Sequence, residues 1–324
     1  MGMKVKYWGV RGSLPSCPTP KQVTEDVRSL MNEYFKAGHK DASQIDAFLS
    51  NHHPAHVGGW GGNTTCVEVE TSTASIIIDG GSGMRNLSEK IVKRLNKQKP
   101  IHIFMTHFHW DHVIGIPFFV PIFIPGLMLK FYAVQPELEF LIRGIFKKPY
   151  FPVPFESLPS KIVFQQLRER APIEVDGVKI TPYQLDHPDP CWGFKIEGDG
   201  KTYAHCVDTE GTRVTREQLG PDLPLYQGVD LMYFDAQYTL PELAEKANWG
   251  HSAAQIGLDI AMREGIGKLV FAHHDPGAGT SQVFEVDQAV REYYEWKMKA
   301  MQASNETAHP VDWQFAVEGL EVDL

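Results

Sequence analysis

The stretch Thr106-His107-Phe108-His109-Trp110-Asp111-His112 places three imidazoles and one carboxylate within six residues. It follows an apolar run at residues 101–105 that predicts a β-strand. Because successive side chains of an extended segment point to opposite faces, we expect His107 and His109 to project to the same side. Asp111 and His112 follow as the chain turns. Neutral imidazole and carboxylate are the ligands that zinc and similar ions prefer, so this stretch predicts a metal site.

The composition of the whole chain is that of a globular enzyme. It has 324 residues, 43% of them apolar, and a formal net charge of -9, which argues against non-specific coating of nucleic acid. The four cysteines have no CxxC spacing, so we expect a reduced, cytoplasmic protein. Residues 113–129 are apolar but contain three prolines, which favours a buried segment over a membrane span.

Strand-like runs recur along the chain, and several of them end in an ionisable residue. They are expected at residues 3–9, 64–70, 74–79, 101–105, 161–166, 178–185, 191–196, 203–209, 231–235, 268–272, 314–317 and 320–324. The residues at strand ends that are able to bind a metal or a proton are His107, His187, Asp208, Asp235 and His273. This pattern predicts a site at one rim of a β-sandwich, with the loops carrying the chemistry.

Local sequence patterns predict the structure of several other segments. Residues 20–58 resemble an insertion with helical periodicity, and their His52, His53 and His56 are interpreted as a solvated loop rather than as a metal site. The glycine-rich run 79–83 is interpreted as a tight turn into a helix reaching about residue 96, although such turns also cradle phosphate. Ser252 followed by Gln255 predicts a capping box and a helix start there, and a long helix is expected at roughly 284–302.

With these residues in view, the chain resembles hydrolases of the metallo-β-lactamase fold, an αββα sandwich of the α/β (α+β) class. Within that superfamily it is most similar to the ribonuclease Z-like phosphodiesterase branch. The resemblance rests on the motif His107-x-His109-x-Asp111-His112 and on later elements that match in order, at residues 185–187, 207–209 and 271–273. It covers nearly the whole length, so we expect one domain, 1–324, with an insertion at about 20–58.

The resemblance implies a dinuclear site. His107, His109 and His187 would hold one divalent ion; Asp111, His112 and His273 would hold the other; and Asp208 would bridge them. Zn²⁺ is the expected metal, with Mn²⁺ or Fe as alternatives. His274, beside His273, stays open as the last ligand or as a substrate contact.

The resemblance also points to phosphoryl chemistry. Asp235 stands where these enzymes carry a carboxylate, and His251 resembles the imidazole that it orients; such a pair beside a dimetal site, with Asp111 close by, is suited to catalysis as a general acid. Arg11, between glycines, is either a phosphate clamp or part of a structural ion pair. The aromatic segment 146–155 is either core or pocket wall.

One departure from ribonuclease Z narrows the expected substrate. No counterpart of its long exosite arm is found, so we expect a small or cyclic nucleotide-like phosphodiester and no stable nucleic-acid or membrane partner. Two alternatives keep the fold: an iron-dependent oxidoreductase, or a hydrolase of acyl substrates such as lactones, thioesters or lactams. The helices of the insertion either cap the pocket or form a homodimer contact.

Overall fold

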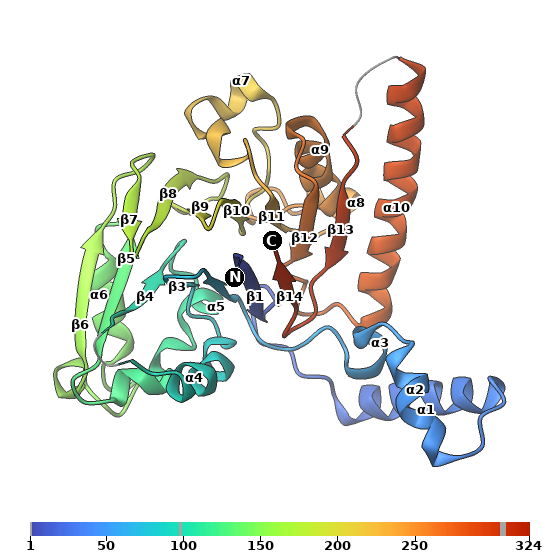
Figure 1. Ribbon diagram of the computed structural model, residues 1–324, viewed down its shortest axis with the longest axis horizontal. Coiled ribbons are helices and arrows are strands. Elements are labelled where there is room, and N and C mark those ends of the chain that lie inside the picture. Colours follow the sequence, from blue (N-terminus) through green and yellow to red (C-terminus); the bar gives the residue numbers. More distant parts are fainter. Residues whose placement is uncertain (1, 97–98, 305–308) are drawn as a thin grey trace.

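Two seven-stranded sheets lie face to face in the computed structural model, which describes residues 2–96, 99–304 and 309–324 (Figure 1). The first sheet has the order β14 (Glu321–Asp323), β1 (Lys4–Gly9), β2 (Cys66–Glu70), β3 (Ser75–Ile78), β4 (Ile101–Phe104), β5 (Met128–Ala133) and β6 (Lys161–Gln166). The second has the order β13 (Asp312–Phe315), β12 (Lys268–Ala272), β11 (Leu231–Asp235), β10 (Lys201–Cys206), β9 (Trp192–Gly198), β8 (Val178–Gln184) and β7 (Ile173–Val175).

Each sheet is mixed, and its parallel half feeds the site. Strands β3 to β6 pair in parallel, as do β10 to β13, whereas the remaining neighbours are antiparallel. Parallel neighbours end at the same edge, so the loops that follow β4, β10, β11 and β12 are carried to one rim of the sandwich.

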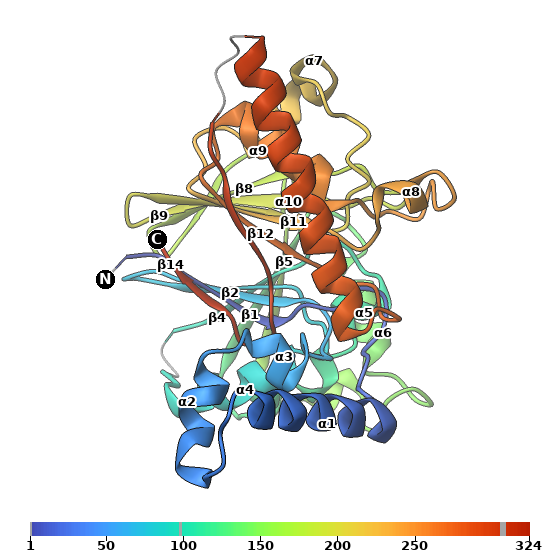
Figure 2. The same ribbon diagram turned by 90° about the vertical axis from the view of Figure 1, so that its right-hand side faces the viewer.

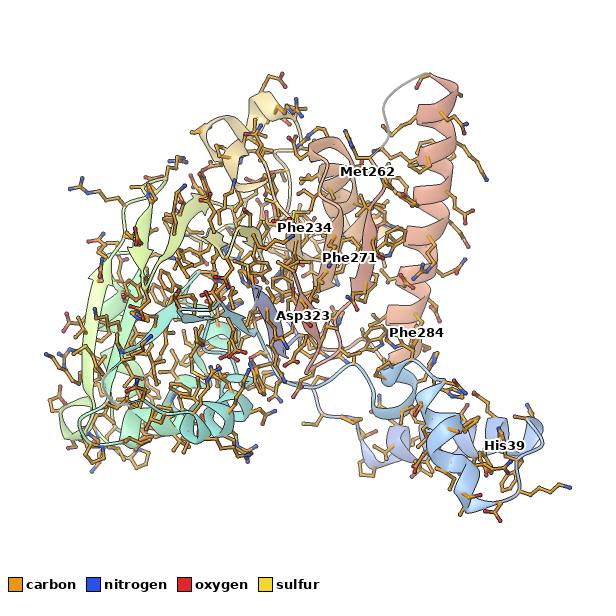
Figure 3. All side chains as sticks on the ribbon, viewed as in Figure 1. His39, Phe234, Met262, Phe271, Phe284 and Asp323 are labelled. Atoms are coloured by element: carbon orange, nitrogen blue, oxygen red, sulfur yellow. The ribbon has the colours of Figure 1, made fainter. Side chains whose placement is uncertain are left out.

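Alternation along the strands supplies three apolar layers. On β3, Ile76 and Ile78 enter the core between the sheets, while Ile77 faces the outer layer of the first sheet. On β11, Tyr233 faces inward and Phe234 faces the helices that cover the second sheet. Figure 3 shows Phe234 beside Phe271 and Met262, which belong to the same outer cluster. This period of two is what a sheet buried on both faces requires.

Helices cover the outer face of each sheet, which confirms the expected αββα sandwich. The first sheet carries α4 (Met84–Lys93), α5 (Trp110–Val113) and α6 (Leu138–Ile145), with 3-10 turns η2 (Ile116–Phe118), η3 (Val120–Phe123) and η4 (Phe155–Ser157). The second carries α7 (Arg216–Leu219), η5 (Gly220–Leu225), α8 (Leu240–Leu243), α9 (Ala254–Glu264) and α10 (Thr280–Ala303). Figure 2 shows α10 running along the outside of this layer.

Residues 20–58 form a helical arm outside the sandwich. The arm consists of α1 (Pro20–Lys36), η1 (Ala42–Gln44), α2 (Ile45–Ser50) and α3 (Pro54–Gly58), and α1 buries none of its residues. Figure 3 places His39 at its far end and Phe284 of α10 at its base, where the Phe284 ring stacks on His56 at 4.0 Å. His52 bonds the Phe48 carbonyl, so these histidines serve local packing.

Some local expectations need correction. The capping box at Ser252 is wrong: α9 begins at Ala254, and the Ser252 hydroxyl donates instead to the Glu210 carbonyl at 3.2 Å. Strand β7 lies outside the expected ranges. The aromatic segment 146–155 divides, since Phe146 is buried in the outer core whereas Tyr150 is exposed. Within the described ranges, every helix is too short or too polar to cross a bilayer.

Candidate metal centre

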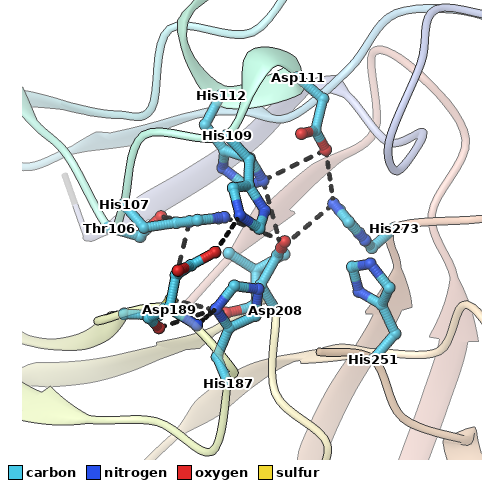
Figure 4. Close-up of polar contacts among 12 residues, drawn as sticks. Thr106, His107, His109, Asp111, His112, His187, Asp189, Asp208, His251 and His273 are labelled. Atoms are coloured by element: carbon cyan, nitrogen blue, oxygen red, sulfur yellow. Dashed lines mark hydrogen bonds and ion pairs between the residues drawn. The ribbon is translucent and has the colours of Figure 1, made fainter. Parts of the chain in front are cut away.

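Loops at one rim of the sandwich bring the predicted site residues together (Figure 4). The motif residues lie between the end of β4 and α5, and His187 follows β8. Asp208 and His273 follow β10 and β12, and Asp235 is the last residue of β11. Figure 4 shows the labelled side chains grouped around Asp208: His107, His109, His112, His187 and His273. Long-range folding therefore assembles what the sequence presents as separate strand ends.

The ligand atoms form two groups that share Asp208. One group contains His107, His109, His187 and Asp208, and the other contains Asp111, His112, Asp208 and His273; in each, the atoms lie within 4.8 Å of one another. Oδ1 of Asp208 is 3.1 Å from Nε2 of His273 and 3.2 Å from Nε2 of His112. Its Oδ2 is 3.4 Å from Nε2 of His107. The shared carboxylate is therefore placed to bridge two ions.

The donor set fits divalent metal ions. Among the described residues, the buried atoms without a hydrogen-bond partner include Nε2 of His107, His112 and His187 and both carboxylate oxygens of Asp208. Unpaired buried polar atoms are costly, and here they converge on one place. Nitrogen and oxygen donors in this number match what zinc and related ions bind.

Electrostatics in the cluster keep its carboxylates ionised. Burial alone would lower the pKa of His112, but the carboxylates of Asp208, Asp111 and Asp79 raise it well above its usual value. Burial would raise the pKa of Asp208, yet the surrounding imidazoles, His112 first, hold it well below the usual range. The carboxylates therefore stay ionised, as ligands of a divalent ion must.

Comparison with known proteins agrees with this geometry. Residues 74–274 match the family model described as the beta-lactamase superfamily domain, a range that contains the motif residues and every strand end named above. The chain belongs to the beta-lactamase superfamily. This confirms the resemblance on which the expected ligand set rests.

Individual relatives place the chain within the superfamily. It is 28% identical to the ribonuclease Z of Azobacteroides pseudotrichonymphae over 218 residues, which cover 55% of this chain and 71% of that protein. Two solved structures share the fold. YhfI of Bacillus subtilis has a TM-score of 0.61 and 15% identity, with 100% of both chains covered. Unliganded yeast PDE1 has a TM-score of 0.59 and 12% identity, with 100% of this chain and 99% of that chain covered. The predicted similarity to the ribonuclease Z-like branch is confirmed.

A buried carboxylate that sequence reasoning missed orients this superfamily site. Asp79 directly follows β3 and is fully buried. It accepts hydrogen bonds from Nδ1 of His112 at 2.8 Å, from the Thr106 hydroxyl at 2.8 Å and from the Thr106 amide at 2.9 Å. A carboxylate behind a metal-ligating imidazole sets its tautomer and direction. The signal was an acid at a strand end, directly before the Gly80 turn.

The turn after Asp79 is a structural turn, as favoured from the sequence. Its amides bond backbone carbonyls: Gly80 to His112 at 2.7 Å and Gly81 to Thr65 at 2.9 Å. A Cβ at Gly81 would lie 2.3 Å from the Asp111 carbonyl oxygen, so only glycine allows this approach to the metal motif. These amides are therefore occupied and do not form a phosphate cradle.

Three site residues have left-handed backbones although none is glycine. Asp79, Asp208 and His273 have φ values of 62°, 55° and 63°. Asp79 and His273 directly follow β3 and β12, and Asp208 lies two residues after β10, where a sharp change of direction turns the side chain toward the rim. Non-glycine residues in this region carry strain of about 1–3 kcal/mol each, which clusters at functional sites.

His251 and Asp235 form a second buried unit beside the cluster. Nδ1–H of His251 donates to Oδ2 of Asp235 at 2.9 Å, and the other Asp235 oxygen accepts the Gln237 amide at 3.0 Å. The His251 ring lies 4.9 Å from that of His273. Burial lowers the pKa of His251, but the Asp235 charge outweighs this and raises it to about 9.

Two candidate substrate contacts take other roles. Arg11 is 6% exposed and donates to the carbonyls of Gly61, Asp275 and Ala278 at 2.9–3.0 Å, so backbone oxygens, rather than the acidic partner of the expected ion pair, engage its guanidinium. His274 points away from the cluster and donates from Nε2 to the Ala316 carbonyl at 2.8 Å. His273, not His274, lies among the ligand atoms.

Two further contacts at the site were not foreseen. The Ser13 amide donates to Oδ2 of Asp111 at 2.8 Å, which ties the first loop of the chain to the motif. Asp189 approaches Nε2 of His109 at 2.9 Å, and both side chains are largely open to solvent, at 68% and 44% exposed. Both residues lie in loops far from the motif in sequence, so local spacing carried no signal for them.

Proposed function

We propose that this protein is a dinuclear metal-dependent phosphodiesterase. His107, His109 and His187 would hold one ion, Asp111, His112 and His273 the other, and Asp208 both. The observation that carries the proposal is the convergence of unpartnered buried donor atoms on Asp208, next to the ion pair of His251 and Asp235.

The bound ions would supply a water activated at neutral pH and positive charge beside the phosphoryl oxygens. The residues of the chain do the rest. His107, His112 and Asp208 are buried and locked by their neighbours, so they hold the reacting centre rigidly. Asp79 keeps the His112 ring turned so that Nε2 faces the site.

His251 is placed to deliver a proton to the leaving oxygen. Asp235 accepts its Nδ1–H, which leaves Nε2 as the atom that faces the substrate. Proton donation to an alkoxide leaving group typically contributes about 10²–10⁴-fold in rate. Because Asp235 is fully buried and also holds the Gln237 amide, it orients the imidazole and is a positioning residue.

A small or cyclic nucleotide-like diester is the proposed substrate. Residues 188–207 consist mainly of the β9–β10 hairpin, so no arm is inserted between His187 and Asp208. The helical arm at 20–58 carries four Lys or Arg against five Asp or Glu, which does not suit a polyanion. The ribonuclease Z relatives support phosphodiester chemistry. We propose Zn²⁺ as the metal, and a homodimer contact through the arm stays open.

The test is hydrolysis of bis(p-nitrophenyl) phosphate and 3′,5′-cyclic AMP by protein of measured metal content. We expect activity on both substrates, lost in Asp208→Asn together with bound metal. Asp230→Asn is the matched control, because Asp230 bonds the Thr202 amide at 2.8 Å at the opposite end of β10. Activity on the aryl diester alone would agree with phosphodiester hydrolysis but not with the proposed cyclic nucleotide substrate. No activity on either ester with full metal content would refute the proposal.

A further inference from the structure

The proposed ligands show where the site opens. His107, Asp111, His112, Asp208 and His273 are buried, whereas His109 and His187 are only partly buried. The His109 side chain is 44% exposed. A substrate that brings its phosphate to the ions must therefore extend its ester group past these two imidazoles.

A large exposed tryptophan stands next to each of these two histidines. Trp110 follows His109 directly at the start of α5 and is 70% exposed. Trp249 is 66% exposed and precedes Gly250, which packs so tightly on His187 that a Cβ there would lie 2.3 Å from its Cδ2. The rings of His109 and His187 have centroids 4.8 Å apart, so the two tryptophans adjoin the same opening.

The turn that carries Trp249 is conformationally constrained. Asn248 and Gly250 both have left-handed backbones, with φ values of 66° and 88°. The Gly250 amide donates to the Glu210 carboxylate at 3.1 Å. Trp249 is therefore held beside His187 by a tight turn rather than placed on a free loop.

An open groove of about 450 Å³ begins at His187 and runs past Asn248. Its other lining residues include Gln184, Thr212 and the carboxylates of Asp186 and Glu210. Asp186 accepts the Arg213 amide at 2.7 Å and the Thr212 hydroxyl at 3.1 Å, and Glu210 holds Gly250. Together with the Arg213 guanidinium and the side-chain amides of Gln184 and Asn248, these carboxylates give the groove both donors and acceptors, which suit the polar edge of a heterocycle.

We propose that Trp110 and Trp249 form an aromatic rim that binds a planar aromatic group on the ester of the substrate, with its polar edge in the groove beside His187. This rests on the proposed phosphodiesterase function and adds the residues that would recognise the substrate: two tryptophans that bind a nucleobase-like ring on the retained alcohol of the diester. Exposed aromatic side chains at the mouth of a polar site mark binding surfaces, and indole faces stack on bases.

The experiment uses three esters with the same p-nitrophenolate leaving group. They retain methanol, thymidine at its 5′ oxygen, or choline, so only the retained group differs. We expect the thymidine ester to have the lowest KM. Trp110→Ala and Trp249→Ala should each raise that KM by about five- to one-hundredfold, the range measured for loss of a base-stacking ring, and should reduce the preference over the methyl ester.

Control variants separate stacking from general effects. Trp→Phe at either position should restore much of the preference, whereas Trp→Leu, which keeps apolar area without an aromatic face, should not. Trp296→Ala removes an equally exposed tryptophan, 63% exposed on α10, and should behave as wild type. Quenching of tryptophan fluorescence by thymidine 5′-phosphate, but not by methyl phosphate, gives a binding readout independent of turnover.

The outcomes distinguish the two proposals. If all three esters are hydrolysed with the same KM, or if the tryptophan variants leave every KM unchanged, the proposed aromatic rim is wrong. The proposed phosphodiesterase function then still stands. Preference for the choline ester also overturns the rim, because the aromatic pair would then bind a cation. Quenching by thymidine 5′-phosphate that is lost in both variants, without hydrolysis of any ester, supports the rim and overturns the function.

Discussion

Replacement of Asp79 tests how the metal centre is held in place. In Asp79→Ala, the Thr106 amide, the Thr106 hydroxyl and Nδ1–H of His112 lose their acceptor in a fully buried position. Loss of one partner from a buried, charge-assisted network costs about 3–5 kcal/mol. With an unfolding entropy of about 0.7 kcal/mol per kelvin for a chain of this length, we expect the Tm to fall by about 4–7 °C.

Asp79→Asn isolates the effect on the metal. The amide keeps the size of the side chain and one acceptor oxygen, but it loses the charge and cannot accept from both Thr106 and His112 at full strength. We expect metal affinity to fall by about 10–100-fold, the usual cost of removing a carboxylate behind a ligating imidazole. The assay is zinc titration against a competing chelator, with Tm of the metal-free protein measured in parallel.

Glu68→Gln is the matched control. Glu68 is also a fully buried carboxylate of the first sheet, held by the Ser75 hydroxyl at 2.9 Å and Nζ of Lys90 at 3.2 Å, away from the cluster. It should lower Tm and leave zinc affinity unchanged. Wild-type zinc affinity in Asp79→Asn, or an equal loss of affinity in Glu68→Gln, would refute the orienting role of Asp79.

Three further predictions follow from single contacts. His251→Ala should keep its metal and lose about 10²–10⁴-fold in kcat on alkyl diesters, with a smaller loss on aryl diesters; an equal loss on both would contradict its role as acid. Arg11→Lys should lower Tm without raising KM, because the three carbonyl bonds are structural. Burial lowers the pKa of His102 from 6.5 to about 4, so the unfolded chain binds the proton first as pH falls through this range. The free energy of unfolding should therefore decrease between pH 6.5 and pH 4 by up to about 1.4 kcal/mol per pH unit. The decrease should be smaller in His102→Gln than in the wild type, and urea unfolding at each pH measures it.

The sequence predicts the fold and the donor set because both depend on local periodicity. Alternation on strands such as β3 and β11 shows which faces are buried. The motif residues were expected on an extended segment, but His107 and His109 lie in the loop after β4 and Asp111 lies in α5. The strand ends at Asp208 and His273 are recognisable in the same way. The residues at these strand ends could be expected to lie close together because parallel strands end at one edge of a sheet.

Other features were decided only by tertiary contacts. Ser252 has the spacing of a capping residue, yet its hydroxyl bonds Glu210, a residue that packs there only in the folded chain. Arg11 donates to a carbonyl fifty residues along the chain, that of Gly61, and to one brought from the other end, that of Asp275, so local sequence could not distinguish a substrate contact from a structural one. The same holds for Asp79, whose partner His112 lies 33 residues further along.

The adjacent pair His273 and His274 shows the division most clearly. From the sequence either residue was able to complete the donor set. The left-handed backbone of His273, with φ at 63°, turns its ring to Asp208, whereas His274 is held by the Ala316 carbonyl on the opposite side. The sequence by itself determined which residue types reach the rim, since strand geometry is local. Tertiary structure decided which of them enter the site, because each buried polar atom takes the partner that distant segments bring to it.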